Sequence, residues 1–225
     1  MPELPEIETV KLQLQKVLIG QKLLKSNFSE INNKKVTSID RKGKMLLINF
    51  GEGLDLGFHF KMTGQLIYDD GKKRIAGGHP SEDFVAKLPN KHTREVFEFE
   101  QGKLFFNDMR KFGWVKINPK FGDGLGPEPF SISSDEFIRR IDKTRVPIKI
   151  AIMDQKRISG VGNIYANDAL WEAGISPQLP VNQLSVTQLS LLFDKLKLVL
   201  NEGIKYGGAT SANYVNLHGL GGHYQ

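Results

Sequence analysis

The sequence predicts an α+β protein in which an N-terminal helix and a β domain precede a helical domain. Three observations predict this order. Apolar residues recur at helical spacing over 5–18, alternate with period two over 54–62, and return to helical spacing after a glycine- and proline-rich stretch at 124–130. The 225 residues therefore divide into a first domain over 1–123, a linker over 124–132 and a second domain over 133–225.

Residues 5–18 carry the signals of an amphipathic helix. Pro5 suits a helix start because its missing N–H costs nothing in the first turn, and Glu6 and Glu8 suit the positive end of the helix dipole. Gly20 is expected to end the helix. The apolar positions that share one face are Ile7, Val10, Leu14, Val17 and Leu18.

The remainder of the first domain contains four stretches with strand character. Strict alternation over 54–62 predicts a half-buried strand, which puts His59 and Lys61 on the face opposite to the apolar one. A hairpin is expected to turn at Gln101–Gly102. The four stretches are KMLLINF (44–50), residues 54–62, VFEFEQGKLFF (96–106) and GWVKI (113–117).

Beyond the linker the pattern predicts four helices. Ser133 or Ser134 is expected to cap the first, which runs to about Ile141. The last is long and covers 186–204. The two between them are expected over 149–155 and 163–173.

Composition narrows the classes of function. There are no cysteines, so a disulfide framework and a thiolate metal site are excluded. No apolar stretch approaches the ~20 residues of a membrane span, and no signal peptide is recognisable, so a cytoplasmic, nucleoid-associated protein without a membrane partner is expected. The formal net charge of +6 and the pI of about 9.3 favour a polyanionic partner.

The positive charge is concentrated between residues 137 and 157. Seven basic residues stand there against two acidic ones, Asp142 and Asp154. A solvated helical face and a nucleic-acid surface explain this run equally well. The basic residues are Arg139, Arg140, Lys143, Arg145, Lys149, Lys156 and Arg157.

The segment RISGVGNIYA (157–166) joins two of the predicted helices. Its Gly-x-Gly gives a tight turn with free N–H groups, and Asn163 can cap the next helix. Backbone amides at a helix N-terminus can bind phosphate, but the same turn also suits a simple packing joint between helices. The basic residues upstream favour contact with a DNA backbone.

Two further segments hold candidate DNA contacts. In NDMRKFGW (107–114), Arg110 and Phe112 stand two residues apart, so in an extended segment they share a face. In one interpretation, the Phe112 ring packs in the core and Arg110 is a surface charge. In the other, the two form a wedge in a DNA duplex: the ring stacks between bases and Arg110 occupies the space of an extruded nucleotide. Lys44, in DRKGKMLL, reads as an ordinary edge lysine when considered alone.

The first residues, MPELPE, suit either a plain helix start or a reactive amino terminus. Removal of Met1 would leave Pro2 with a free secondary amine, and an α-amine has a reference pKa near ~7.7–8, so part of it is unprotonated at neutral pH. Such an amine can attack a sugar C1′ and form an iminium. Glu3 could donate a proton if burial raised its pKa.

Together these segments resemble the bacterial formamidopyrimidine-DNA glycosylases, in the family that includes endonuclease VIII. They occur in the family order and span nearly the whole chain. The matching segments are MPELPEIETV, RKGK followed by LL, MTG (62–64), NDMRKFG, LGPEP and IKIAIMDQKRISGVGNIYANDALWEAGISP (148–177). The resemblance implies a two-layered β-sandwich with an N-terminal helix, joined to an all-α helix–two-turns–helix domain.

The resemblance also implies roles for individual residues. Pro2 matches the nucleophile, Glu3 the catalytic acid, Glu6 a second acid near the site, and Lys44 the catalytic lysine of the β domain. The triplet that fills the void in the duplex matches Met62, Arg110 and Phe112, and His59 is placed with the DNA-binding residues. In the helical domain Lys149 and Asn163 match contacts to the backbone near the lesion. The glycine-rich loop over the lesion is expected to include Tyr214, Gly219 and Gly221.

The implied activity is base-excision repair. A monomeric bifunctional glycosylase and lyase would remove oxidised purines, such as 8-oxoguanine and formamidopyrimidines, from double-stranded DNA. It would act through a Schiff base at Pro2 with β,δ-elimination, without a metal or another cofactor. PELPE, MTG and the Arg-x-Phe wedge fit this purine-lesion branch better than the endonuclease VIII branch.

Three departures from the family pattern leave an alternative open. The family's four-cysteine zinc finger has no counterpart, Lys61 stands where a small residue is usual, and a retained Met1 would make Pro2 an amide. A catalytically weak or inactive damaged-DNA-binding protein of the same fold is therefore the alternative. An RNA-associated protein with a similar helical module fits less well, because it would not need PELPE or the wedge.

Overall fold

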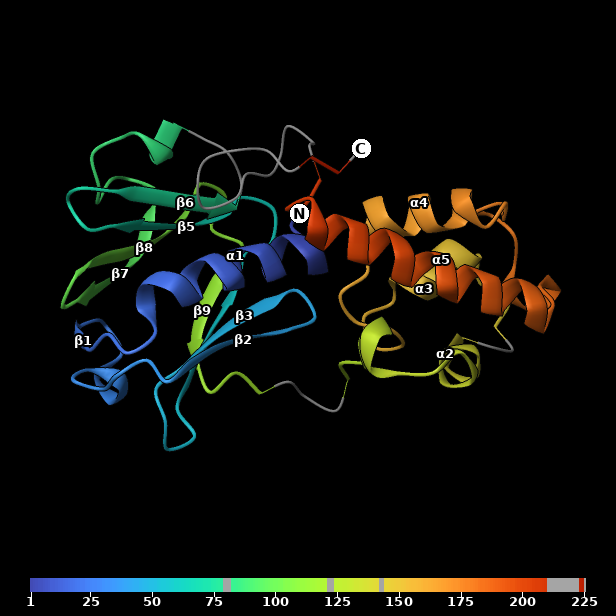
Figure 1. Ribbon diagram of the computed structural model, residues 1–225, viewed down its shortest axis with the longest axis horizontal. Helices are drawn as coiled ribbons and strands as arrows, with labels where there is room; N and C mark the ends of the chain where they lie inside the picture. The colour runs from blue at the N-terminus through green and yellow to red at the C-terminus, as the bar shows by residue number, and fades with distance from the viewer. Residues whose placement is uncertain (79–81, 121–123, 142–143, 210–222, 225) are drawn as a thin grey trace. The chain divides into compact units, whose positions relative to one another are not determined.

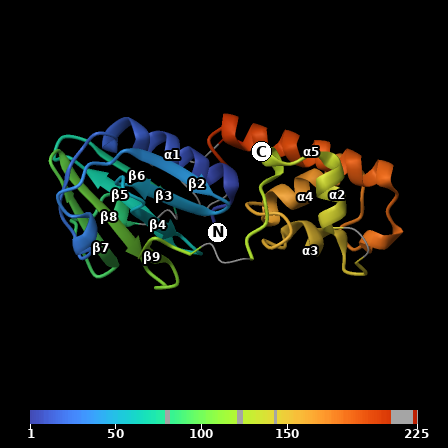
Figure 2. The ribbon, with the colours of Figure 1, turned by 90° about the horizontal axis from the view of Figure 1, so that it is seen from below.

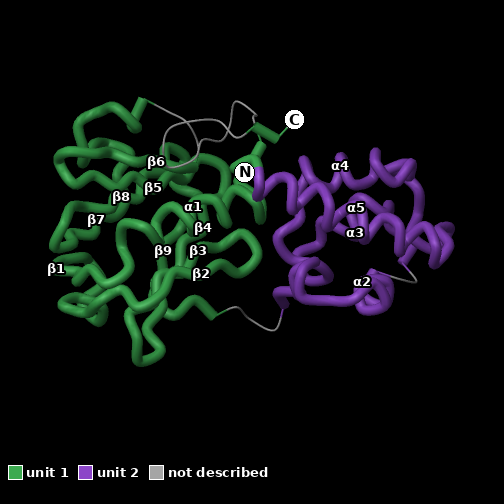
Figure 3. The backbone as a smooth tube through the Cα atoms, viewed as in Figure 1, with its two compact units in different colours: residues 1–120, 206–225 green, residues 121–205 purple. Residues whose placement is uncertain are grey.

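The computed structural model describes residues 1–78, 82–120, 124–141, 144–209 and 223–224 (Figure 1). The chain forms two compact units (Figure 3): the first is Met1–Lys120 with Tyr206–Gln225, and the second is Phe121–Lys205. This division differs from the sequence boundaries at the C-terminal end, where 206–225 was expected in the second domain. One contact between this segment and the first unit is the hydrogen bond from the Ala209 N–H to the Glu6 carboxylate.

The first unit is a sandwich of two antiparallel sheets (Figure 2), as the resemblance implied. The strand order is β1-β7-β8-β5-β6 in one sheet and β2-β3-β4-β9 in the other. The five-stranded sheet contains β1 (Leu23–Lys25), β5 (Gly64–Asp69), β6 (Arg74–Gly78), β7 (Thr93–Phe99) and β8 (Gly102–Asp108). The four-stranded sheet contains β2 (Ser38–Lys42), β3 (Met45–Asn49), β4 (Asp55–His59) and β9 (Trp114–Ile117).

Helix α1 (Leu4–Leu18) completes the core of the sandwich. It contacts β2 and β3 of one sheet and β6 of the other, and Figure 1 shows it running along the side between the layers. Of its predicted apolar face, Ile7, Val10, Leu14 and Leu18 are fully buried, and Val17 is partly buried against the same core. Burying a side chain of this size contributes about 1.5–3 kcal/mol, so the apolar face fixes the helix and the residues at its start.

Some strand predictions were shifted or missing. The strand expected over 54–62 ends at His59, because Lys61 has a φ of 50° and begins a turn. The hairpin between β7 and β8 pairs Phe99 with Gly102, which moves its turn one residue toward the N-terminus. Strands β1, β2, β5 and β6 had not been predicted. Residues Gly64–Tyr68 of β5 are all buried, so that strand shows no alternation of polar and apolar residues.

The second unit is helical, as predicted. Its α-helices are α2 (Ser134–Ile141), α3 (Ile148–Met153), α4 (Asn163–Glu172) and α5 (Val186–Lys205). Ser133 caps α2, because its Oγ accepts the N–H of Glu136 at 3.2 Å. Short 3-10 helices lie at Ser29–Ile31, Glu82–Phe84, Pro129–Ser131 and Val181–Gln183. No helix in the described ranges combines the length and hydropathy of a membrane span.

Replacement of Gly203 by alanine is expected to destabilise the second unit. An added Cβ would overlap the ring of Tyr165, a fully buried residue of α4, so the ring would have to shift. Overpacking typically costs about 1–3 kcal/mol, more than the ~1 kcal/mol that alanine gains over glycine in a helix. Urea unfolding measures the net loss, and Gly203→Ala combined with Tyr165→Leu should restore part of it.

Candidate active site and nucleic-acid interface

The start of α1 holds the candidate catalytic acids in fixed positions. Pro2, Glu3 and Glu6 are all buried, whereas Met1 is exposed and joined to Pro2 by an ordinary amide. Glu3 is the N-cap of the helix, and its N–H donates to Oε2 of Glu6 at 2.8 Å. This capping-box contact places two carboxylates beside the amino terminus.

Lys44 brings a cation to the same carboxylates. It lies in the turn between β2 and β3 and is only 7 % exposed. Burial lowers the pKa of Lys44, while the carboxylates of Glu3 and Glu6 oppose that shift. The structure therefore places the carboxylates of Glu3 and Glu6 around the buried amine of Lys44, and Pro2 is adjacent to Glu3 in the chain.

An ion pair that the sequence did not reveal ties these elements together. Arg41 Nε donates to Oε2 of Glu8 at 2.8 Å, and Nη1 donates to the carbonyl of Gly43 at 3.0 Å. Burial alone would raise the pKa of Glu8, but Lys11 and Arg41 outweigh it and hold the pKa below its usual range. Arg41 thus connects the helix that carries Glu3 to the turn that carries Lys44.

Glu6 has a second backbone partner. Its Oε1 accepts the N–H of Ala209 at 2.9 Å, while Oε2 accepts from Glu3. Ala209 pairs with Tyr224 in a short parallel bridge. The same carboxylate therefore anchors the start of α1 and the segment that follows α5. The predicted loop residues Tyr214, Gly219 and Gly221 lie outside the described residues.

The predicted wedge lies on a turn organised by one buried carboxylate. Asp108, at the end of β8, accepts the N–H of Gly113 at 2.6 Å, the N–H of Arg110 at 3.2 Å and the hydroxyl of Thr63. The Thr63 hydroxyl in turn accepts the N–H of Arg110 at 3.1 Å. Asp108 thereby joins the turn after β8 to the turn before β5, which carries Met62.

The wedge side chains themselves are exposed. Met62 is 46 % and Phe112 is 57 % exposed, so neither side chain is part of the core. The guanidinium carbon of Arg110 lies 4.9 Å from the centre of the Phe112 ring. The two residues contact each other as a cation–π pair rather than through an extended strand, because Lys111 between them has a φ of 61°.

His59 lies at the end of β4, opposite Trp114 in β9. Its Nδ1 accepts the backbone N–H of Lys61 at 3.1 Å, so the proton of the neutral ring is on Nε2. Burial is the largest cause that lowers the pKa of His59, to about 4, and the charges of Lys61 and Lys44 add to it. His59 is therefore a neutral donor at physiological pH.

The depressed pKa of His59 predicts a pH-dependent stability. In the unfolded chain the pKa is near 6.5 and in the folded protein it is about 4, so between these values the unfolded state binds more protons. Stability is expected to fall by roughly 2 kcal/mol as pH drops through this window. Urea unfolding at several pH values measures the free energy of unfolding. As the pH falls from 6.5 to 4, the difference in this free energy between the wild type and His59→Gln should become smaller. Parallel profiles for the two proteins would contradict the assignment.

In the second unit Lys149 and Asn163 lie at helix starts. Lys149 is the second residue of α3 and is partly exposed. Asn163 was expected to cap α4, but Gly162 occupies the N-cap position and Asn163 is the first helical residue, exposed to solvent. Its side chain is therefore available for an external contact rather than used by the helix.

The glycine-rich turn before α4 is held by a side chain that the sequence did not single out. Nε2 of Gln155 donates to the carbonyls of Met153 and Val161, both at 2.8 Å, and Oε1 accepts the N–H of Gly160 at 3.0 Å. Gly160 has a φ of 91°, which favours glycine. This network fixes the turn in the shape that presents Asn163.

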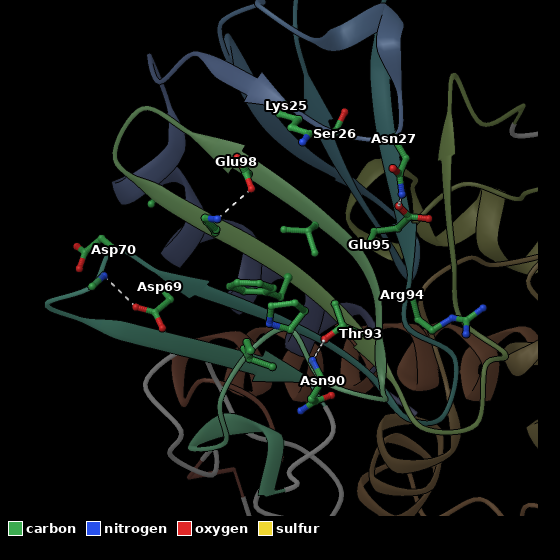
Figure 4. Close-up of a pocket in the computed structure, with 17 residues that line it drawn as sticks. Lys25, Ser26, Asn27, Asp69, Asp70, Asn90, Thr93, Arg94, Glu95 and Glu98 are labelled. Carbon is green, nitrogen blue, oxygen red and sulfur yellow. Dashed lines mark hydrogen bonds and ion pairs between the residues drawn. The ribbon is translucent and has the colours of Figure 1, made fainter.

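A cavity of about 820 Å³ lies over β7 and β8 (Figure 4), but it includes none of the predicted site residues. Its charged lining is mixed: Lys25, Arg94 and Lys103 stand among Asp69, Asp70, Glu95 and Glu98. Because acidic side chains are at least as frequent as basic ones in this lining, the cavity does not suit a polyanion such as DNA. In the described ranges no group of three or more histidine, cysteine or acidic side chains is placed to hold a metal ion.

Two protein-family models match the chain. The model described as the formamidopyrimidine-DNA glycosylase N-terminal domain matches residues 1–115, and the one described as the formamidopyrimidine-DNA glycosylase H2TH domain matches residues 125–215. Among curated proteins, the formamidopyrimidine-DNA glycosylase of Solibacter usitatus is 34 % identical and that of Pelotomaculum thermopropionicum is 35 % identical. Both matches cover 100 % of this chain and 85 % or 86 % of the relative.

Solved structures give the same result. The MutM (Fpg) protein of Thermus thermophilus superposes with a TM-score of 0.84 at 31 % identity, over 100 % of this chain and 85 % of its own. A mutant of the Lactococcus lactis Fpg protein, in complex with a Fapy-dG containing DNA, superposes with a TM-score of 0.82 at 28 % identity. That match covers 98 % of this chain and 84 % of the neighbour.

Proposed function

The chain belongs to the formamidopyrimidine-DNA glycosylase family, whose members are DNA glycosylases and lyases that act in the repair of oxidised bases, and from this premise we propose a specific substrate and mechanism. The proposed substrates are oxidised purines, 8-oxoguanine and formamidopyrimidines, in double-stranded DNA. The Fapy-dG containing DNA bound by the Lactococcus lactis relative supports this choice. The observation that carries the proposal is the gathering of Glu3, Glu6 and Lys44 beside Pro2.

In the proposed reaction, the Pro2 nitrogen, freed by removal of Met1, attacks C1′ of the damaged nucleotide. The C1′–base bond breaks, and the base leaves with its electron pair and takes up the proton that the Pro2 nitrogen loses. Glu3 protonates the ring oxygen as the sugar opens. The product is an iminium between Pro2 and C1′. It acidifies the C2′ hydrogen, whose loss expels the 3′ phosphate, and a second elimination expels the 5′ phosphate. Water then hydrolyses the imine and releases Pro2.

The electrostatics around Lys44 support its proposed role. A buried ammonium between two carboxylates is held in position by their charges, and it can move toward a phosphate when DNA brings one. Lys44 would hold that phosphate and offset negative charge near the reacting sugar. Glu6, through its bonds to Glu3 and Ala209, would position the acid rather than exchange protons.

DNA binding is proposed to use the exposed wedge. The enzyme would extrude the damaged nucleotide, which costs a few kcal/mol, and less at a damaged or mispaired base. Met62, Arg110 and Phe112 would fill the space left in the duplex, since an exposed aromatic ring under a guanidinium can replace base stacking. In the second unit Lys149 and Asn163 would contact the backbone.

No zinc enters the proposed chemistry. The 225 residues contain no cysteine, so the family's four-cysteine site has no ligands within them. The side chains and the amine proposed for the covalent steps, Pro2, Glu3 and Lys44, all belong to the first unit.

Trapping with borohydride tests the proposal. Protein whose intact mass shows that Met1 is absent is incubated with an 8-oxoguanine duplex and borohydride, which reduces the iminium to a stable amine. The expected result is a covalent complex whose peptide map places the DNA on Pro2. Tight binding to the damaged duplex without any covalent complex would instead identify a non-catalytic binding protein. Undamaged duplex is the control and should give no complex.

A further inference from the structure

We propose that Gly126 is a positioning residue for DNA binding, because it fixes the turn that presents Asn163. Gly126 belongs to LGPEP (125–129), a stretch whose composition predicts a linker. In the structure this stretch is attached to the turn over 155–160 that precedes α4, within the second unit. The inference rests on the proposed function, in which Asn163 contacts the DNA backbone.

Two main-chain hydrogen bonds attach the linker to the turn, and together they are called the linker anchor below. The N–H of Gly126 donates to the carbonyl of Gln155 at 2.8 Å. The N–H of Ser159 donates in the other direction, to the carbonyl of Pro127 at 2.9 Å. Because one bond holds the chain at Gln155 and the other holds it at Ser159, this part of the turn cannot change shape without straining the linker anchor.

The linker anchor requires glycine at position 126. Gly126 is buried, and a Cβ built on it would lie 2.5 Å from the carbonyl oxygen of Arg157 and 2.7 Å from that of Lys156. Both oxygens belong to the main chain of the turn, so the turn itself would have to move to make room for any side chain. The missing Cβ therefore allows the close approach of two backbones that the linker anchor needs.

Gln155 connects the linker anchor to the start of α4. Its main-chain carbonyl accepts from Gly126, while its side-chain Oε1 accepts the N–H of Gly160 at 3.0 Å and its Nε2 donates to the carbonyl of Val161 at 2.8 Å. A displacement of Gln155 therefore also displaces Gly160, and with it the exposed Asn163 at the first position of α4. Hydrogen bonds weaken steeply beyond about 3.2 Å, so a displacement on the order of 1 Å is enough to lose a contact to a phosphate oxygen.

Replacement of Gly126 by alanine tests the linker anchor, and Gly124→Ala is its matched control. Both changes add one methyl group to the same linker, but a Cβ at Gly124 meets only the side chain of Lys156, at 3.7 Å, which is an ordinary contact. The measurement is the affinity for a duplex with a tetrahydrofuran abasic-site analogue at one salt concentration. Gly126→Ala is expected to weaken binding on the order of tenfold, and Gly124→Ala by less than about twofold.

A double-mutant cycle shows whether Gly126 acts through Asn163. Asn163→Ala removes the proposed contact itself and is expected to weaken binding on the order of tenfold. If the linker anchor serves that contact, adding Gly126→Ala to Asn163→Ala should weaken binding further by less than about threefold. Additive losses, about a hundredfold for the double variant, would show that Gly126 acts independently of Asn163 and would overturn the inference.

Amide hydrogen exchange shows whether the effect is local. In Gly126→Ala the N–H of Gly160, which is held by the Gln155 side chain, should exchange on the order of tenfold faster, whereas that of Leu196 in the middle of α5 should not change. Unchanged exchange at Gly160 would overturn the inference.

Pro127→Gly decides the question if Gly126→Ala does not fold. It keeps the carbonyl that accepts from Ser159 and adds no atom, but it frees the backbone that proline restricts, so binding should weaken about threefold. Wild-type affinity of Pro127→Gly in that case, or of a folded Gly126→Ala protein, would overturn the inference and leave the proposed function standing. Failure of the wild-type protein to bind the duplex, or wild-type affinity of Asn163→Ala, would instead contradict the proposed function.

Discussion

A protein that carries one additional residue before Pro2 is expected to lose the covalent chemistry completely while it keeps its fold. An amide nitrogen has no available lone pair, so it cannot form the iminium that the reaction requires. Excision and strand cleavage at 8-oxoguanine should fall on the order of 10³-fold or more. The measurement compares two preparations from one cleavable fusion, one processed to a free Pro2 and the other to a blocked Pro2, in borohydride trapping and single-turnover cleavage.

The matched pair also separates catalysis from binding. Both preparations should bind a duplex containing the tetrahydrofuran analogue with affinities within about twofold, because the wedge and the second unit are unchanged. Equal trapping by the blocked protein would show that another amine is the nucleophile. Lys44→Arg then identifies it, because Lys44 is the buried lysine beside Glu3 and Glu6 and its pKa is lowered by burial.

Replacement of Asp108 by alanine is expected to have the second large effect, on stability and on the wedge together. The buried Asp108 carboxylate accepts from Gly113, Arg110 and Thr63, and the change removes this shared acceptor from all three donors. Hydrogen bonds to a charged group contribute about 1.5–3 kcal/mol each and are not additive, so a total loss of about 3–4 kcal/mol is expected. Urea unfolding measures that loss directly.

The same change should impair extrusion of the damaged base. Without Asp108 the turn no longer holds Arg110 over Phe112, so excision should fall at least on the order of tenfold under conditions in which the variant is folded. Met62→Ala is the matched control, because it removes an exposed wedge side chain and leaves the Asp108 bonds in place. It should lower excision with a stability change below about 0.5 kcal/mol. An Asp108→Ala protein as stable as the wild type would contradict the role given to the carboxylate.

The helices and strands that were predicted correctly have one buried face and one solvent-exposed face, which gives a periodic pattern of apolar residues. The helix at the start and the helices of the second unit have that pattern, and their positions were predicted to within a few residues. Strand β5 is buried on both faces, and β6 (RIAGG) consists largely of small residues. Neither strand alternates, so only its neighbours in the sheet define it.

For the candidate site, the sequence predicted the side chains proposed to contact DNA but not the side chains that hold them in place. Pro2, Glu3 and Arg110 stand in short motifs. The contact between Arg41 and Glu8 joins positions 33 residues apart, and that between Thr63 and Asp108 joins positions 45 apart. No local pattern predicts such pairs, because they depend on which strands become neighbours. The cap at Gly162 was missed for another reason: asparagine suits a cap, but the turn fixed by Gln155 starts the helix one residue earlier.

The two bonds of Glu6 have a consequence for the order of biosynthesis. One carboxylate accepts from Glu3 and from Ala209, a residue 203 positions later. Residues 1–120 of the first unit leave the ribosome before Ala209 is made. The second bond of Glu6 cannot form until Ala209 has been translated. In a nascent chain the Glu6 carboxylate therefore has only its partner at the start of α1 until the segment that contains Ala209 has been made.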